Sequence, residues 1–212
     1  MSARDDVLAR IRAAHRAAPP PVLAYTDIAR NYQTSSELDH DQLLDRLVDR
    51  LLDYKALVRQ TSTDQLAATV ATALAERGVD TLVVPAGLDD GWLTGTTVTR
   101  HLDTATDPLS VTELDAVDGV ITTCAVAVAE TGTLILDASA GQGRRAVSLV
   151  PDYHLCVVRA GTVVADVPQA LARLEATRPL TMISGPSATS DIELNRVEGV
   201  HGPRTLEVII VN

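Results

Sequence analysis

Aromatic residues are nearly missing from this chain. It has no phenylalanine, and aromatic side chains make up 2% of its 212 positions, with Trp92 as the single tryptophan. The core must therefore be built from Leu, Val, Ile and Ala, and platforms on which nucleic-acid bases stack are scarce. Positive charge is also in deficit, since the formal net charge of -10 repels a phosphate backbone. Both deficits exclude nucleic acid as an expected partner.

Cysteine is equally rare, with Cys124 and Cys156 as the two examples. An iron–sulfur cluster usually takes four thiolates from one chain, so two thiols predict that this chain holds no cluster. A zinc site needs three or four ligands, and the pair formed by His154 and Cys156 has no others near it in sequence. We therefore expect neither a cofactor nor a protein-bound metal in this chain.

Long hydrophobic runs are lacking too. The most apolar window, residues 119–129, is too short to span a bilayer and contains Thr122 and Thr123. Charged residues near the N-terminus have no apolar stretch behind them, which is not the pattern of a signal peptide. With 46% apolar and 22% charged residues, the composition is that of a folded globular chain. The sequence predicts a cytoplasmic protein that does not bind membranes.

Two parts are expected along the chain. Residues 1–40 predict an N-terminal helix, stopped by the prolines at 19–21, and then an extended arm. Residues 41–212 predict one α/β domain, because a leucine-spaced helix over 43–52 precedes an alternation of strands and helices that favours a parallel sheet. A hairpin is expected around residues 130–133, and Ser190 with Glu193 matches a capping box that begins a helix.

Several polar turns carry candidate chemistry. Glu130 sits at the tip of the predicted hairpin, either as a solvated turn residue or as a base or nucleophile. Residues 141–146 fit the pattern G-x-G-x-x-A, but without the strand and helix that a dinucleotide site requires, so we interpret them as a flexible loop in which Arg144 is a candidate for an anion. The Ser184–Ser187 turn presents backbone N–H groups to a carboxylate or phosphate, or only caps a helix.

A histidine and an arginine lie close together just before the last predicted strand. His201 can move a proton near neutral pH, and Arg204 can hold a carboxylate through two hydrogen bonds. The alternative is a structural histidine in a turn beside a solvated arginine. For the functional reading, we expect Glu130, His201 and Arg204 to line one shared cavity.

These motifs form a series in a fixed order. The series is Ala129-Glu-Thr-Gly-Thr133, Gly143-Arg-Arg145, Ser148-Leu-Val-Pro151 with His154, Ser184-Gly-Pro-Ser187 with Asp191-Ile-Glu193, and Gly199-Val-His-Gly-Pro-Arg204. It resembles the LUD-domain family, and within it the lactate-utilisation protein C group. The resemblance is strongest from about residue 119 to the end.

The resemblance implies a fold and a role. The fold would be a sheet of the NagB/RpiA/CoA-transferase type flanked by helices, with the N-terminal helical extension before it. The role would be that of the subunit without a cluster in a system that oxidises L-lactate to pyruvate, beside partner proteins that carry iron–sulfur clusters. Whether this subunit is itself an enzyme is left open. The ligand would be a small carboxylate.

The predicted site follows from these motifs. Glu130 and His201 are the expected catalytic residues. The expected substrate-binding residues are Thr131, Gly132, Thr133, Arg144, Gly185, Pro186, Ser187, Asp191, Glu193 and Arg204. The family often has Arg and Ala at the positions of Ala188 and Ser190, so this loop lacks a side chain that would hold an anion.

Two other functions stay open. CoA-transferases of the same superfamily place a catalytic Glu in a Glu-Asn-Gly turn, which Glu130-Thr131-Gly132 resembles over three residues. This favours a free-standing enzyme of the CoA-transferase or isomerase type, with Glu130 acting on a small carboxylic acid. The third hypothesis is a structural scaffold subunit whose turns serve packing alone.

Overall fold

The structure, a computed structural model, describes residues 2–17, 24–32, 35–189, 197–198 and 201–212. The chain divides into two compact units, residues 1–33 and 34–212. The first unit contains helix α1 (Ala3–Ala17) and the short 3-10 helix η1 (Tyr25–Asp27). Helix α1 begins where the Ser2 hydroxyl accepts a hydrogen bond from the Asp5 backbone N–H.

Helix α2 (His40–Asp53) opens the second unit where the leucine spacing predicts a helix. Asp39 caps it by accepting a hydrogen bond from the backbone N–H of Gln42, whose side chain accepts one from the Asp39 backbone in return. Leu44, Leu47 and Leu51 form its buried stripe.

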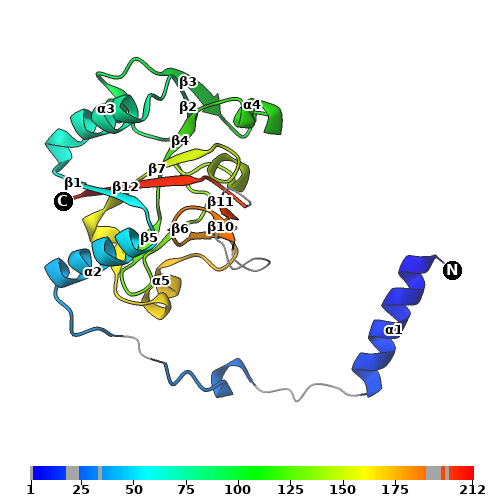
Figure 1. The fold of residues 1–212 in the computed structure, drawn as a ribbon. Helices are drawn as coiled ribbons and strands as arrows, with labels where there is room; N and C mark the ends of the chain where they lie inside the picture. Colours follow the sequence, from blue (N-terminus) through cyan, green and yellow to red (C-terminus); the bar gives the residue numbers. More distant parts are fainter. Residues whose placement is uncertain (1, 18–23, 33–34, 190–196, 199–200) are drawn as a thin grey trace. The chain divides into compact units, whose positions relative to one another are not determined.

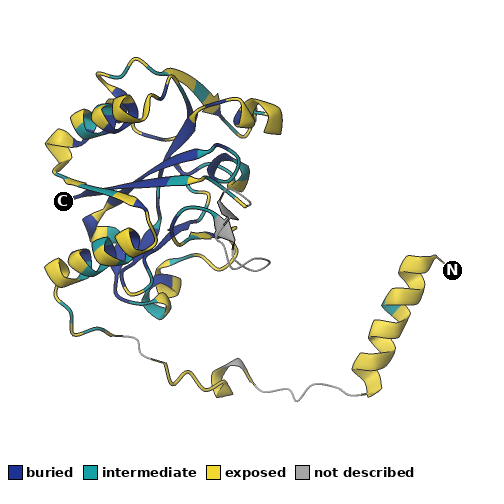
Figure 2. Ribbon diagram, viewed as in Figure 1, coloured by how far each residue is buried: buried dark blue, intermediate teal, exposed yellow. Residues whose placement is uncertain are grey.

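Six parallel strands form the main sheet, in the order β1-β12-β7-β4-β2-β3. Their bounds are β1 Leu57–Thr61, β2 Thr81–Pro85, β3 Thr99–Asp103, β4 Gly119–Thr123, β7 Tyr153–Arg159 and β12 Thr205–Val211. The central strands β7, β4 and β12 are buried over nearly their whole length, as a parallel sheet covered on both faces requires (Figure 2).

Different elements cover the two faces of this sheet. Helix α3 (Leu66–Arg77), which follows η2 (Thr63–Gln65) and ends at Gly78, packs on the face that carries Tyr153, Leu155 and Val157. The alternate residues of β7, among them Cys156 and Val158, face α2 and a second sheet. Figure 1 shows α3 and α2 on opposite sides of the strands.

The second sheet has the order β8-β5-β6-β9. Its strands are β8 Val163–Val164, β5 Val126–Val128, β6 Thr133–Leu136 and β9 Thr181–Ile183, and α5 (Val167–Arg173) covers its outer face. Strands β5 and β6 pair antiparallel with Val128 opposite Thr133, which confirms the predicted hairpin. Strands β10 (Ala188–Thr189) and β11 (Val197–Glu198) form a separate antiparallel ribbon.

The predicted fold class, an α/β sheet flanked by helices with an N-terminal helix, is confirmed. Its assignment to the NagB/RpiA type stays a prediction. Several short elements were not predicted from the sequence. An exposed edge strand such as β3, for example, has no alternating apolar face that would indicate it. The other short elements that were not predicted are α4 Val111–Asp115, η3 Asp90–Leu93, η4 Arg145–Ser148 and η5 Ala160–Thr162. The helix predicted from Ser190 lies outside the described residues.

Candidate functional site

Two of the predicted motifs lie side by side at the base of the β10–β11 ribbon. The backbone N–H of Ser187 donates a hydrogen bond to the Pro203 carbonyl at 2.8 Å. The backbone N–H of His201 donates one to the Ser187 hydroxyl at 3.0 Å. The Ser184–Ser187 turn and the segment from His201 are therefore held together, as the motif series led us to expect.

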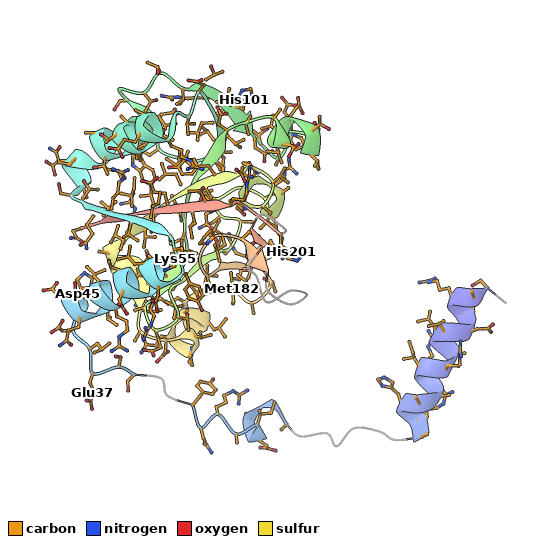
Figure 3. The ribbon with its side chains drawn as sticks, in the orientation of Figure 1. Glu37, Asp45, Lys55, His101, Met182 and His201 are labelled. Atoms are coloured by element: carbon orange, nitrogen blue, oxygen red, sulfur yellow. The ribbon has the colours of Figure 1, made fainter. Side chains whose placement is uncertain are left out.

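Together these two turns border a cavity of about 250 Å³. We call it the histidine cavity; its lining includes Ser148, His154, Gly185, Pro186, Ser187 and His201. Met182 and His201, both lining residues, are labelled in Figure 3. His154 and Leu206 are the second residues of β7 and β12, so the cavity lies at the amino ends of these parallel strands.

One lining residue, His154, is almost completely buried, with 1% of its surface exposed. Its Nε2 lies 2.7 Å from the hydroxyl of Thr122, which is itself fully buried on β4. Its Nδ1 has no hydrogen-bond partner among the residues that the structure describes. Burial lowers the pKa of the His154 imidazole to about 4, so the ring is neutral near pH 7.

Sequence reasoning missed His154 and Thr122 as site residues. It placed His154 in the motif series and weighed it as a metal ligand, but assigned it no role in the site. The available signal was a polar side chain inside each of two otherwise apolar strands, since buried polar groups are rare and need partners.

Two glycines fix the neighbouring turns against the end of α2. Gly185, with a φ of 77°, lies so close that a Cβ added to it would stand 2.6 Å from the Cβ of Tyr54. A Cβ added to Gly132, with a φ of 57°, would stand 2.8 Å from the Cβ of Arg50. Both positions therefore require glycine, for close packing and for a left-handed backbone.

Hydroxyl groups connect the hairpin turn to the histidine cavity. The Thr133 hydroxyl lies 2.7 Å from that of Thr131 and 2.8 Å from that of Ser184, which lines the cavity. Thr133 is buried, and the strand pairing of β6 with β9 brings it beside Ser184. The predicted residues Thr131 and Thr133 thus reach the cavity lining through Ser184, whereas Gly132 packs against α2.

Glu130 occupies a different place. Its carboxylate accepts a hydrogen bond from Arg46 on α2 at 2.5 Å, and both side chains are substantially exposed. Together with Thr131 and the last turn of α2, it lines a separate hollow of about 400 Å³. Its predicted catalytic role stays a prediction, but the structure gives it an ion-pair partner that the sequence did not reveal.

Both predicted anion-binding arginines are engaged by carboxylates. Arg144 forms an ion pair with the buried Asp103 at 2.9 Å, and it donates a further hydrogen bond to the Leu109 carbonyl. Arg204 binds Asp152 through two hydrogen bonds, of 2.7 and 2.8 Å, which lower the pKa of the Asp152 carboxyl. Neither arginine lines the histidine cavity.

The expectation of one shared cavity for Glu130, His201 and Arg204 is therefore wrong. His201 lines the histidine cavity, Glu130 lines the hollow beside α2, and Arg204 lines neither. Arg46 on α2 holds the Glu130 carboxylate, and Asp152 holds the guanidinium of Arg204. Asp191 and Glu193 lie outside the described residues.

A further cavity, of about 330 Å³, lies at the carboxyl ends of β2, β4 and β7. Ligands of open α/β sheets usually bind at that edge. The Arg159 guanidinium lies over the Trp92 ring at 5.9 Å. The side-chain amide of the buried Gln142 accepts a hydrogen bond from the Asp137 backbone N–H and donates one to the Ser139 hydroxyl. Contact with the Cys156 thiol and burial raise the pKa of Cys124, which stays a thiol. The buried polar groups here are thus satisfied within the fold.

Within the described part of the chain, no three His, Cys, Asp or Glu side chains gather as a metal site requires, and the expectation of no metal stays a prediction. None of the helices that the structure describes combines the length and the apolar character that a membrane crossing needs.

Residues 44–211, which include every described residue of the histidine cavity, match the LUD domain. The chain belongs to the LUD domain family. Lactate utilization protein C of Deinococcus radiodurans is 48% identical over 85% of this chain and 84% of its own length. Lactate utilization protein C of Halalkalibacterium halodurans is 30% identical, again over 85% of this chain and 84% of its own length.

A solved structure of a relative agrees with this LUD domain fold. The crystal structure of a DUF162 family protein from Deinococcus radiodurans matches with a TM-score of 0.69 and 43% sequence identity. The match covers 82% of this chain and 99% of that chain. The resemblance to the LUD family that the motif series indicated is therefore confirmed.

Proposed function

We propose that this chain serves lactate utilisation, as the subunit without an iron–sulfur cluster in a system that oxidises L-lactate to pyruvate. The observation that carries the proposal is the 48% identity, over 85% of the chain, to a protein named lactate utilization protein C. The 30% identical relative that carries the same name supports it over an equal share of the chain.

The chemistry divides the work between this chain and its partners. Oxidation of L-lactate to pyruvate releases two electrons and two protons. The two cysteines of this chain cannot supply the four thiolates of a cluster, so the electrons would leave through iron–sulfur clusters held by partner proteins. This chain would bind the small acid or hold the partner proteins together.

The histidine cavity is the proposed place for the acid. It combines neutral hydrogen-bonding groups with apolar side chains, and His201 at its border is exposed and available to exchange protons with solvent. A carboxylate at this border stays partly hydrated, which avoids the cost of burying an unpaired charge. Arg204 would reach such a carboxylate only after release from Asp152.

Co-purification, followed by an activity assay, tests the proposal directly. The full chain is purified from cells grown on L-lactate, and the proteins that travel with it are analysed for iron and acid-labile sulfide. Cluster-bearing partners are expected, and the assembly is expected to reduce an artificial electron acceptor with L-lactate while the chain alone does not. Oxidation of L-lactate by the purified chain alone would contradict the proposal, and so would a chain that travels without cluster proteins.

The alternative enzyme of the CoA-transferase or isomerase type depends on Glu130. Its exposed ion pair with Arg46 does not favour a nucleophile, because a carboxylate that is already paired is less available to attack. That hypothesis expects Glu130→Gln to abolish turnover while the fold survives. The scaffold hypothesis instead expects that no small acid binds the purified chain.

A further inference from the structure

We propose that His154 is a ligand-binding residue, whose Nδ1–H donates a hydrogen bond to the C2 oxygen of a small 2-oxo or 2-hydroxy acid in the histidine cavity. The proposal rests on the proposed function for the choice of acid, and it names the group that the acid presents to the protein.

One ring nitrogen of His154 lacks a partner within the described residues. His154 lines the histidine cavity, yet its Nδ1 is buried and has no partner within the described residues. A buried polar atom without a partner destabilises the folded state, and such atoms are rare unless they serve another purpose. It is the single buried side-chain atom of this kind in the part of the chain that the structure describes.

The contact with Thr122 favours a ring hydrogen on Nδ1. The hydroxyl of Thr122 is fully buried, and within the described residues its side-chain partner is His154 Nε2 at 2.7 Å. If Nε2 donated to Thr122, the hydroxyl hydrogen would lack an acceptor. If Thr122 donates to Nε2, the one hydrogen of this pair without a partner lies on Nδ1, where a ligand oxygen can accept it, whereas in the reverse arrangement a ligand at Nδ1 leaves the hydroxyl hydrogen unpaired. The second arrangement places the remaining hydrogen on Nδ1 and makes it a donor.

The lining of the histidine cavity favours an uncharged ligand atom. No Lys or Arg is among the described residues that line the histidine cavity, and the His154 imidazole, which lines it, is neutral near pH 7. A neutral donor in apolar surroundings suits an uncharged carbonyl or hydroxyl oxygen, whereas a carboxylate there would be desolvated without a counter-charge. The carboxylate of the acid therefore belongs at the cavity border, and its C2 oxygen belongs against His154.

Nuclear magnetic resonance tests the donor directly. Long-range ¹H–¹⁵N spectra of the full chain, with His154→Gln for assignment, report which nitrogen is protonated. The expected result is a neutral ring with the hydrogen on Nδ1, and Thr122→Val is expected to shift the tautomer population. A ring that carries its hydrogen on Nε2 would overturn the proposal.

Titrations then test the ligand, with pyruvate, L-lactate, propionate and acetone as probes. Pyruvate and L-lactate should shift the Nδ1 resonance and should bind roughly tenfold more tightly than propionate, which lacks the C2 oxygen. His154→Phe, which keeps a ring without the N–H, should remove that preference. His101→Gln, at a distant strand, is the control and should keep it.

The outcomes separate this proposal from the proposed function. Acid binding with no shift at Nδ1 and no effect of His154→Phe overturns the role of His154 and leaves the proposed function standing. A shift with acetone but with neither acid supports the donor and contradicts binding of lactate by this chain. No shift with any of the four probes overturns the role of His154.

Discussion

The two faces of strands β7 and β12 treat their buried polar groups in opposite ways. On the α3 face, the Tyr153 hydroxyl donates to Glu207 at 2.9 Å and the Arg59 Nε donates to the same carboxylate at 2.5 Å. Arg59 also binds Glu76 at 2.6 Å. On the other face, His154 has one hydrogen bond and one ring nitrogen without a partner among the described residues.

Tyr153 and His154, which are neighbours on β7, therefore have different roles. Tyr153 and Glu207 satisfy each other, and burial, followed by the charge of Glu207, raises the pKa of the tyrosine so that it stays a donor. A satisfied network of this kind specifies the fold. The unpaired nitrogen of His154 weakens the fold, and proteins retain such costs where a ligand uses the group.

The largest expected effect is on the paired face. Glu207→Ala should lower the free energy of unfolding by roughly 3 to 5 kcal/mol, because it leaves a buried Tyr153 hydroxyl and a partly buried guanidinium without their partner. Chemical denaturation measures this change. Glu76→Ala removes the exposed partner of the same Arg59 and should cost less than about 1 kcal/mol. Equal losses in the two variants would refute the contrast between them.

Acid should weaken the fold through His154. The folded-state pKa of about 4 lies below the ordinary value of 6.5, so between these values the unfolded chain binds a proton that the folded chain does not. This stabilisation is present above pH 6.5 and is lost as the pH falls towards 4, by up to roughly 3 kcal/mol. Denaturation at several pH values measures it. His154→Gln should lack this component, and identical pH profiles for both proteins would disprove it.

Removing both members of the unpaired site should change stability little. In Thr122→Val with His154→Leu, neither an unpaired hydroxyl nor an unpaired imidazole remains. We expect a free energy of unfolding within about 1 kcal/mol of that of the original chain, or higher. Thermal denaturation tests this, with Thr122→Val alone as the matched single variant. A loss as large as that of Glu207→Ala would mean that His154 is a structural residue.

The smallest effect belongs to Arg204. Its ion pair with Asp152 is mostly exposed, so Arg204→Ala should lower the free energy of unfolding by less than about 1 kcal/mol. Because Arg204 does not line the histidine cavity, pyruvate affinity should also change less than threefold, or about 0.6 kcal/mol. Calorimetry measures the affinity. A much larger loss of affinity would restore the carboxylate-binding role that the sequence suggested.

The sequence predicts local features of this molecule well. Leucine spacing located α2, because this signal depends on residues within one or two turns of each other. The hairpin around Gly132 was predicted for the same reason. The motif order led to the LUD family, which a pattern of composition or spacing alone does not reach.

Pairings across the sheet were beyond sequence reasoning. Thr122 and His154 meet because β4 and β7 are neighbours in a given register, with Thr122 beside Cys156. Similarly, Arg204 finds Asp152 only when β12 lies next to β7. One-residue changes of register would turn each side chain to the opposite face, so charge and polarity in the sequence do not identify partners.

The contacts of Gly132 and Gly185 with Arg50 and Tyr54 give the end of α2 an additional importance. Two loops that are distant in sequence therefore pack against one helix terminus, and the position of that terminus affects both of them. Any displacement of that helix terminus would therefore reach both the histidine cavity and the hollow beside α2.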